Sequence, residues 1–183
     1  MSALYWIIII IAVIVLFVIY VYNALVRLKN EIKNSWAQID IQLKRRHDLI
    51  PNLIETVKGY AKHEKGLLTE ITKERTAVMK AASMAEKAAA SAKLSESLHN
   101  LIIAVENYPT LKANENFLQL QEELAGTENK IAYSRQHYND VVMEYNNRLQ
   151  VFPSNLIANS FGFGQEQMFD VPESERKPVK VEF

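Results

Sequence analysis

The chain contains an apolar stretch that is long enough to cross a membrane. Twenty consecutive apolar or aromatic residues run from Ala3 to Tyr22, and no charged residue precedes Arg27. As an α-helix this stretch is about 30 Å long at about 1.5 Å per residue, which matches the hydrocarbon core of a bilayer. A buried core helix is the alternative, but Ile and Val on every side leave no face for water. The stretch therefore predicts a membrane-spanning helix.

A cleaved signal peptide is the competing interpretation. Such a peptide begins with basic residues, has an apolar segment of about 7–15 residues and ends in a small-residue cleavage site. The segment 1–6 has no Lys or Arg, the apolar stretch is longer, and no Ala-x-Ala tripeptide follows it. The lack of Cys also excludes lipoprotein processing. We therefore expect a retained anchor.

Aromatic and basic residues mark the ends of this anchor and indicate its orientation. Tyr and Trp prefer the headgroup region, whereas Lys and Arg favour the cytoplasmic side. The residues that we predict to lie at the membrane interface are Tyr5, Trp6, Tyr20, Tyr22, Arg27 and Lys29. Because the basic residues follow the stretch and none precedes it, we expect a single pass with the N-terminus outside and the C-terminal domain in the cytoplasm.

Composition favours one all-helical body after the anchor. The 21 basic residues balance 21 acidic residues, so no basic field indicates nucleic-acid binding. Five Gly and five Pro are few, and this favours long helices over sheets. The absence of Cys excludes disulfides, thiol catalysis and cysteine-based zinc sites. We predict an all-α fold, in which one N-terminal transmembrane helix continues into an antiparallel bundle of long helices.

The first helix is expected to extend beyond the anchor without a linker. Apolar residues recur every three or four positions from Leu25 to Leu43, and no Gly or Pro separates them from the anchor. This pattern predicts a stiff rod over residues 3–46. Pro51 cannot donate an amide hydrogen bond, so either the helix kinks there or a second helix begins with Asp48 as its N-cap.

The middle of the chain is rich in Ala. Residues 67–106 are predicted to form one helix or two, and eight Ala occur between Ala77 and Ala92. Because Ala favours helix but buries little surface, we expect a long exposed helical arm. A close helix contact between subunits is the alternative.

The last long helix carries a seven-residue repeat. Apolar or aromatic residues recur at every seventh position from Phe117 to Phe152, which predicts a helix of about 36 residues packed along a neighbour, as in a coiled coil. Thr110 or Asn114 is the expected N-cap, and Pro153 the expected stop.

Four Asn residues in this helix are unexpected, because Asn is a weak helix former. They are Asn129, Asn139, Asn146 and Asn147. Since buried amides need partners, we expect them to hydrogen-bond to the loops around residues 106–109 and 112–117. A surface that binds another protein is the alternative.

The composition changes after Phe152. The remaining residues contain Gly, Asn and three Phe, and then end in a polar segment broken by Pro. Phe161, Phe163 and Phe169 are expected to pack the tail onto its own domain rather than to contact membrane or a partner, and the final residues to be disordered. The predicted organisation is an anchor at 1–26, a helical domain at 27–152 and a tail at 153–183.

Three stretches of the sequence resemble a known family. They are LKNEIKNSWAQIDIQLKRRHDLIPNLIETVKGYAKHEK, ENYPTLKANENFLQLQEELAGTENKIAYSRQHYNDVVMEYN and FPSNLIANSFGF. Together with the anchor, they are similar to the LemA family of bacterial membrane proteins. The resemblance covers residues 23–66 and 106–164. It implies a single N-terminal membrane helix with its short end outside, an antiparallel helical domain and no established enzymatic activity.

The densest polar cluster lies in the first of these stretches. Candidate residues for a partner-binding or structural polar cluster are Arg45, Arg46, His47, Asp48, Pro51, Tyr108, Asn139 and Asn146. A base beside a carboxylate suits acid–base chemistry, but a helix kink also needs caps and charge pairs. We expect the structural role and no catalytic residue.

Metal and cofactor sites are not predicted. Di-iron bundles use pairs of Glu-x-x-His motifs, and that spacing occurs once here, at Glu96 and His99. The Gly-Phe-Gly at 162–164 lacks the third Gly and the following helix of a dinucleotide loop. We therefore expect no metal, no cofactor and no small-molecule substrate.

These features together favour a membrane-anchored scaffold or adaptor in the bacterial inner (cytoplasmic) membrane. The expected partners are the lipid bilayer, copies of the same chain bound through the soluble helices, and another membrane protein. The anchor has no Gly and hence no Gly-x-x-x-Gly dimer motif. A sensor or regulator of a membrane enzyme such as a protease is the alternative, and a hydrolase that depends on His47 is the third interpretation.

Overall fold

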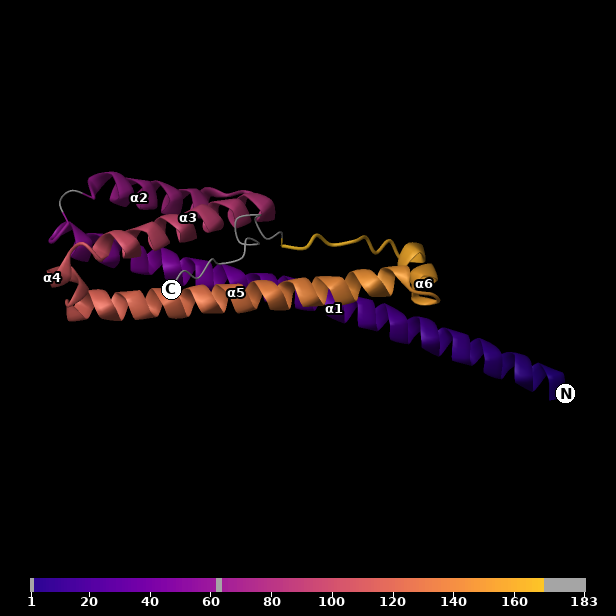
Figure 1. Ribbon diagram of the computed structural model, residues 1–183. Coiled ribbons are helices and arrows are strands. Elements are labelled where there is room, and N and C mark those ends of the chain that lie inside the picture. Colours follow the sequence, from indigo (N-terminus) through magenta and orange to yellow (C-terminus); the bar gives the residue numbers. More distant parts are fainter. Residues whose placement is uncertain (1, 62–63, 170–183) are drawn as a thin grey trace, which may run out of the picture. The chain divides into compact units, whose positions relative to one another are not determined.

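The described part of the chain is helical throughout. The computed structural model describes residues 2–61 and 64–169, and these ranges contain six helices and no strand. In chain order the helices are α1 (Ser2–Lys58), α2 (Lys65–Lys80), α3 (Met84–Val105), α4 (Pro109–Lys112), α5 (Glu115–Gln150) and α6 (Ser154–Ser160) (Figure 1). The predicted all-α fold is confirmed.

The chain divides into two compact units. The first, which we call the anchor unit, contains Met1–Gln38 and Ser134–Met168. The second, which we call the hairpin unit, contains Ile39–Tyr133 together with Phe169. Both α1 and α5 contribute one part to each unit.

The anchor unit begins with the predicted membrane anchor. Every side chain from Ala3 to Phe17 is exposed, and the helix is long and apolar enough to cross a membrane. Contiguous apolar surface on this scale marks contact with lipid or protein rather than water. The first buried residues are Val21 and Leu25, which are 7% and 0% exposed. The chain is therefore anchored in the membrane by the segment before Val21.

The helix α1 continues through Pro51 to Lys58. The predicted rod was therefore too short, and the alternative of a second helix that begins at Asp48 is wrong. Proline removes one amide donor from the helix, but Ile50 and Leu53 on either side of it are fully buried. Core packing therefore holds the helix together across the missing hydrogen bond.

In the hairpin unit, α2 and α3 pack against each other as a helical hairpin (Figure 1). At the turn, the Ser83 hydroxyl accepts a hydrogen bond from the Glu86 amide at 3.2 Å, and the Glu86 carboxylate accepts one from the Ser83 amide at 3.3 Å. This reciprocal capping box starts α3 afresh within the Ala-rich segment. Ala88 and Ser91 are buried. Of the two predicted forms, residues 67–106 form two stacked helices, so the prediction of a single long exposed arm is wrong, although four of the eight Ala stay exposed: Ala77, Ala82, Ala85 and Ala89.

The helix α5 has the predicted length of 36 residues, although it begins at Glu115. The Asn114 side chain accepts a hydrogen bond from the Phe117 amide at 3.0 Å, so Asn114 acts as the predicted cap. Five members of the seven-residue repeat are at most 9% exposed: Phe117, Leu124, Ile131, Tyr138 and Tyr145. The sixth, Phe152, lies beyond the end of the helix and is 74% exposed.

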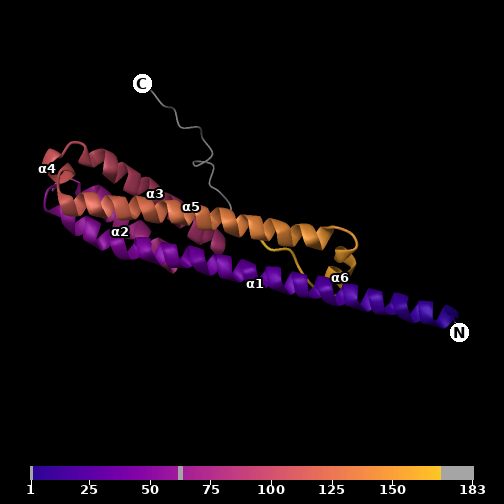
Figure 2. The same cartoon turned by 90° about the horizontal axis from the view of Figure 1, so that it is seen from below.

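The anchor unit is closed by aromatic contacts. The rings of Trp36 on α1 and Tyr138 on α5 meet edge to face with centroids 5.8 Å apart. Tyr22 contacts Phe161 and Phe163 at 4.9 and 5.7 Å, and α6 lies beside α1 in both views (Figures 1 and 2). The prediction that the tail Phe residues pack onto their own chain is confirmed for the half-buried Phe163 and for Phe169, which is 2% exposed, whereas Phe161 contacts Tyr22 but keeps 56% of its side chain exposed. The disorder predicted for the final residues concerns positions 170–183, which lie outside the described residues.

Candidate functional site

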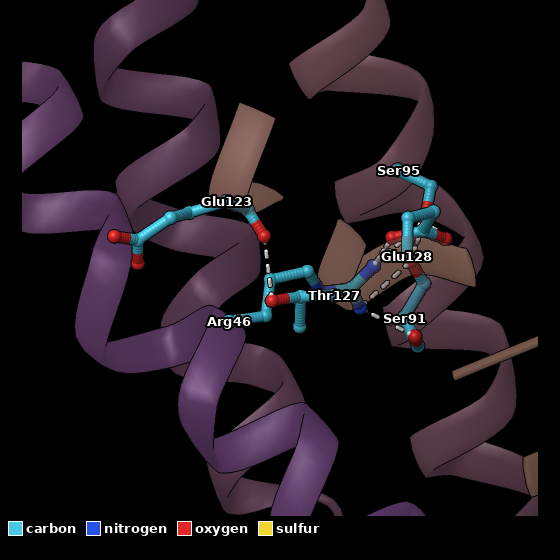
Figure 3. A network of polar contacts seen from close by, with 6 residues as sticks. All are labelled: Arg46, Ser91, Ser95, Glu123, Thr127 and Glu128. Carbon is cyan, nitrogen blue, oxygen red and sulfur yellow. Dashed lines mark hydrogen bonds and ion pairs between the residues drawn. The ribbon is translucent and has the colours of Figure 1, made fainter. Parts of the chain in front are cut away.

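A buried arginine forms the candidate site in the hairpin unit. Arg46 lies on α1 and is 1% exposed. A charged side chain is costly to bury unless it is paired and hydrogen-bonded. Its guanidinium group is directed toward serine and glutamate side chains of α3 and α5 (Figure 3).

The guanidinium group is held by three side chains. Its Nη1 donates to the Glu128 carboxylate at 2.6 Å and to the Ser95 hydroxyl at 2.8 Å. Its Nη2 donates to the Ser91 hydroxyl at 2.5 Å. The Ser95 hydroxyl in turn donates to the second oxygen of Glu128 at 2.8 Å. Charge-assisted bonds of this kind are about twice as strong as neutral ones, so the network ties α1, α3 and α5 together.

Helical spacing places these partners on facing surfaces. Ser91 and Ser95 are four residues apart, which puts both on one face of α3. On α5, the Thr127 hydroxyl donates to the backbone oxygen of Glu123 at 2.7 Å, so this buried threonine is satisfied within its own helix (Figure 3). Thr127 thus takes no part in binding Arg46. The acidic partner of Arg46 on α5 is Glu128, whose side chain is 41% exposed.

A hollow of about 310 Å³ opens beside this network. Its polar side is formed by Arg46, Ser95 and Glu128, and apolar residues of α1, α3 and α5 line the rest. His99 and Gln121 also line it. The volume is at the lower end of small-molecule pockets, at about 300 Å³.

The network is arranged for holding helices rather than for transferring protons. Four of the five guanidinium donors lie on the two Nη atoms, which bind Glu128 and the serines, while Nε is buried with no partner among the described residues. An anionic ligand would have to displace Glu128 from Arg46. The described residues also contain no group of three or more His, Asp or Glu side chains that could hold a metal ion.

The structure does not gather the predicted polar cluster into one site. Consecutive residues of α1 point in different directions, so only Arg46 enters the buried network. Arg45 is exposed and lies 3.9 Å from the Glu123 carboxylate, and Asp48 is exposed. Pro51 is half-buried one turn further along the helix.

His47 faces α2 instead. The Arg75 Nε donates to the backbone oxygen of His47 at 2.8 Å, and the His47 Nδ1 is buried without a described partner. Burial, and then the charge of Arg75, lower the pKa of His47 below 6.5, although Asp48 opposes the shift. The surroundings of His47 therefore favour its neutral form.

The remaining predicted polar residues lie elsewhere. The Tyr108 hydroxyl donates to the Glu64 carboxylate at 2.9 Å in the hairpin unit, and this bond is the main reason that the pKa of Tyr108 is raised. Asn139 and Asn146 belong to the anchor unit, where both are half-buried.

Asn146 binds the C-terminal segment rather than a loop. Its amide nitrogen donates to the Glu166 backbone oxygen at 2.8 Å, and its amide oxygen accepts from the Glu166 nitrogen at 3.0 Å. The Tyr138 hydroxyl donates to the Gln167 backbone oxygen at 2.9 Å. The expectation that Asn146 binds the loops at 106–109 or 112–117 is therefore wrong. It acts as a two-bond clamp that holds the tail along α5.

The predicted interface residues flank the exposed apolar segment. Tyr5, Trp6 and Tyr20 are 66–67% exposed, and Tyr22 is 39% exposed because it packs on the two tail Phe residues. Arg27 is exposed, and the Lys29 ammonium group lies 3.8 Å from the Glu166 carboxylate. Lys29 is thus shared between the interface and the tail.

The network partners were not found by sequence reasoning. Ser91, Ser95 and Glu128 carry no motif, and the signal that points to them is weak. Two Ser residues interrupt the apolar stripe of α3 on the side where Ala88 and Leu94 are buried. A buried hydroxyl on an apolar stripe needs a hydrogen-bond partner, but that partner can be a carbonyl of its own helix, as Ser91 is for Ser95, so the pattern does not identify Arg46.

Comparison with known proteins supports the resemblance seen in the sequence. The sequence pattern described as the LemA family matches residues 35–183, which is more than half of the chain. The chain belongs to the LemA family. A curated relative, Protein LemA of Metamycoplasma hominis, is 27% identical over 86% of this chain and 72% of its own length. Magnetosome protein MamQ 2 of Paramagnetospirillum magneticum is 21% identical over 86% of this chain and 68% of its own length.

The LemA match begins after the membrane anchor. It includes Arg46, the α2–α3 hairpin and the whole of α5. A third relative, Magnetosome protein MamQ of Magnetospirillum gryphiswaldense, is 20% identical over 86% of this chain and 68% of its own length. The LemA pattern thus covers the complete Arg46 network.

Proposed function

We propose that this chain is a non-catalytic scaffold or adaptor, anchored in the bacterial inner membrane, that assembles with copies of itself through its helices. In this proposal the N-terminus faces outside, and the residues after the anchor lie in the cytoplasm. Orientation rests on the basic residues that follow the anchor, beginning with Arg27 and Lys29.

The observation that carries the proposal is the continuity of α1. One helix of 57 residues contains both the exposed apolar segment and the residues that build the buried core after it. No loop lies between the anchor and Trp36, which packs on Tyr138. A chain built in this way holds protein surface next to a bilayer without a flexible tether, which suits a scaffold.

The polar residues of the hairpin unit support a structural role. The two Nη atoms of Arg46 donate hydrogen bonds to Ser91, Ser95 and Glu128, so the charge of Arg46 is paired within the fold. The relatives named as magnetosome proteins are also consistent with a role at a cellular structure rather than in a reaction.

Exposed apolar side chains offer contacts for self-assembly. Ile41 on α1 and Ile103 on α3, both in the hairpin unit, are 63% and 56% exposed. Burying such side chains between subunits contributes about 1.5–3 kcal/mol each. A charge at either position should therefore oppose assembly.

The mass of the full-length protein in detergent tests this proposal. We expect several copies per particle, and fewer copies after Ile41→Glu or Ile103→Glu. Lys44→Glu is the matched control, because Lys44 is an exposed polar residue of the same helix as Ile41. A monomer that carries one foreign membrane enzyme would overturn self-assembly and favour a regulator.

A further inference from the structure

A second group of exposed apolar side chains lies in the anchor unit. We call it the α6 patch, and its members are Val151, Phe152, Leu156 and Phe161, which are 59%, 74%, 58% and 56% exposed. They belong to the turn after α5, to α6 and to the residue after α6. Large apolar side chains grouped in this way mark an interaction surface.

The other face of α6 is buried in its own unit. Ile157 and Ala158 are 8% and 0% exposed, whereas their neighbour Leu156 is open. Asn159 and Ser160 give α6 an exposed polar side as well. Leu156 on α6 and Phe152 before it are the large apolar side chains that the unit leaves open.

Contacts within the anchor unit place this patch beside the end of the anchor. The Phe161 ring is 4.9 Å from Tyr22, a residue that closes the apolar stretch of α1. On α5, Arg148 lines the same hollow as Tyr20 and Arg27. Trp36 pairs with Tyr138, so α5 runs antiparallel to α1 in this unit and its chain continues past Arg148 toward the anchor. The turn that follows α5 lies in that continuation (Figure 2), and Val151 and Phe152 belong to this turn.

Basic residues of the anchor unit lie near the end of the anchor, next to Tyr20. Arg27 and Arg148 line a hollow of about 330 Å³ next to Tyr20. Aromatic rings and cationic side chains side by side are typical of the headgroup level of a membrane. The patch and the end of the anchor therefore meet in one unit at the Phe161–Tyr22 contact, and Arg27 and Arg148 belong to the same unit.

We propose that the α6 patch inserts into the bilayer leaflet at which the anchor emerges, giving this chain a second membrane contact that does not span. Lipid fits this surface better than a second copy of the chain, because Phe161 of the patch contacts Tyr22 at the end of the anchor, which lies in lipid. This inference rests on the anchoring of α1.

Single-Cys labelling tests the proposal, because the natural chain has no Cys. The full-length variants Phe152→Cys and Leu156→Cys are labelled with an environment-sensitive dye and placed in bilayers that carry quencher-labelled lipids. Leu16→Cys reports on the anchor itself. Gln136→Cys is the matched control, since Gln136 is exposed on α5, in the same unit, and lies about 21 Å along the helix from the end of α5 at Gln150.

We expect lipid quenching at positions 152 and 156 to approach that at 16 and to exceed that at 136 by at least about twofold. Quenching at 16 alone would overturn the α6 contact and leave the anchor intact. An apolar dye spectrum at 152 without quenching by lipid would show that a protein surface covers the patch, which also overturns the proposal. No quenching at position 16 would show that the apolar segment of α1 does not lie in the bilayer.

Discussion

Arg46 shows how much a single side chain can fix in this chain. It is buried, and its partners come from two other helices. Replacing it with Ala removes the guanidinium donor from the Ser91 and Ser95 hydroxyls and leaves the Glu128 carboxylate with only the hydrogen bond from Ser95. Breaking a buried ion pair from one side costs about 3–5 kcal/mol, and the partial exposure of Glu128 reduces this to about 3 kcal/mol.

Urea unfolding of the full-length protein in detergent measures this effect. We expect Arg46→Ala to lower the free energy of unfolding by about 3 kcal/mol, and Arg45→Ala by less than about 0.5 kcal/mol, because the exposed Arg45 lies 3.9 Å from its partner. Arg46→Lys should fall between them, since an ammonium group cannot reproduce the guanidinium fork. Equal losses at positions 45 and 46 would contradict the network.

His47 provides a prediction about pH. Burial lowers its pKa in the folded state below the unfolded value of 6.5, so the unfolded chain binds a proton first as the pH falls. This residue therefore favours the folded state fully above pH 6.5, and stability is lost as the pH falls from 6.5 toward the lower folded pKa.

The pH dependence of unfolding tests this assignment. His47→Gln should flatten the fall in stability below pH 6.5, because Gln does not titrate. His99→Gln, at an exposed position of α3, is the control and should leave the slope unchanged. A slope that survives His47→Gln would assign the effect to other groups.

At the scale of helices, the long periodic elements could be predicted and the interruptions could not. The seven-residue repeat gave the length of α5 because its members pack as one buried column. The predicted end of α1 was wrong because the tendency of Pro51 to break a helix is a local effect. The burial of Ile50 and Leu53 in the core outweighs it. The break in the Ala-rich segment was left open between one helix and two, because it depends on one capping box at Ser83 and Glu86.

The buried site was predicted only in part, for a related reason. Arg46 stood out as part of a charged run, but a run does not reveal which member turns inward. Its partners on α3 and α5 are 45 to 82 residues away in sequence. Pairing across such distances depends on how helices pack, which the single sequence does not specify.

The clamp between Asn146 and the tail gives a prediction at this scale. Asn146→Ala removes both hydrogen bonds to the Glu166 backbone, so the tail segment should loosen from α5. Amide hydrogen exchange should become faster at Glu166, whose N–H is bound to Asn146, by about fivefold, which corresponds to about 1 kcal/mol. Asn147→Ala is the matched control, because Asn147 is an exposed neighbour. Equal exchange in both variants would refute the clamp.

For the whole molecule, the proposed orientation makes a prediction of its own. Two single-Cys variants test it. Ala3→Cys places a thiol at the start of the apolar stretch, and Asn129→Cys places one at an exposed position of α5. In intact cells, a membrane-impermeant thiol reagent should label the variant at 3 and should label the variant at 129 only after lysis. The opposite result would reverse the orientation.

The unbroken course of α1 has a consequence for tolerated insertions and deletions. One helical residue corresponds to a rotation of about 100°, so adding one residue between Val21 and Leu25 would swing Tyr22 away from Phe161 and Phe163. Adding seven residues restores the angular phase to within about 20°. In related chains, insertions or deletions in α1 between the membrane anchor and the buried core should therefore correspond to nearly whole helical turns. The tail and α6 would then shift together along the axis of α1.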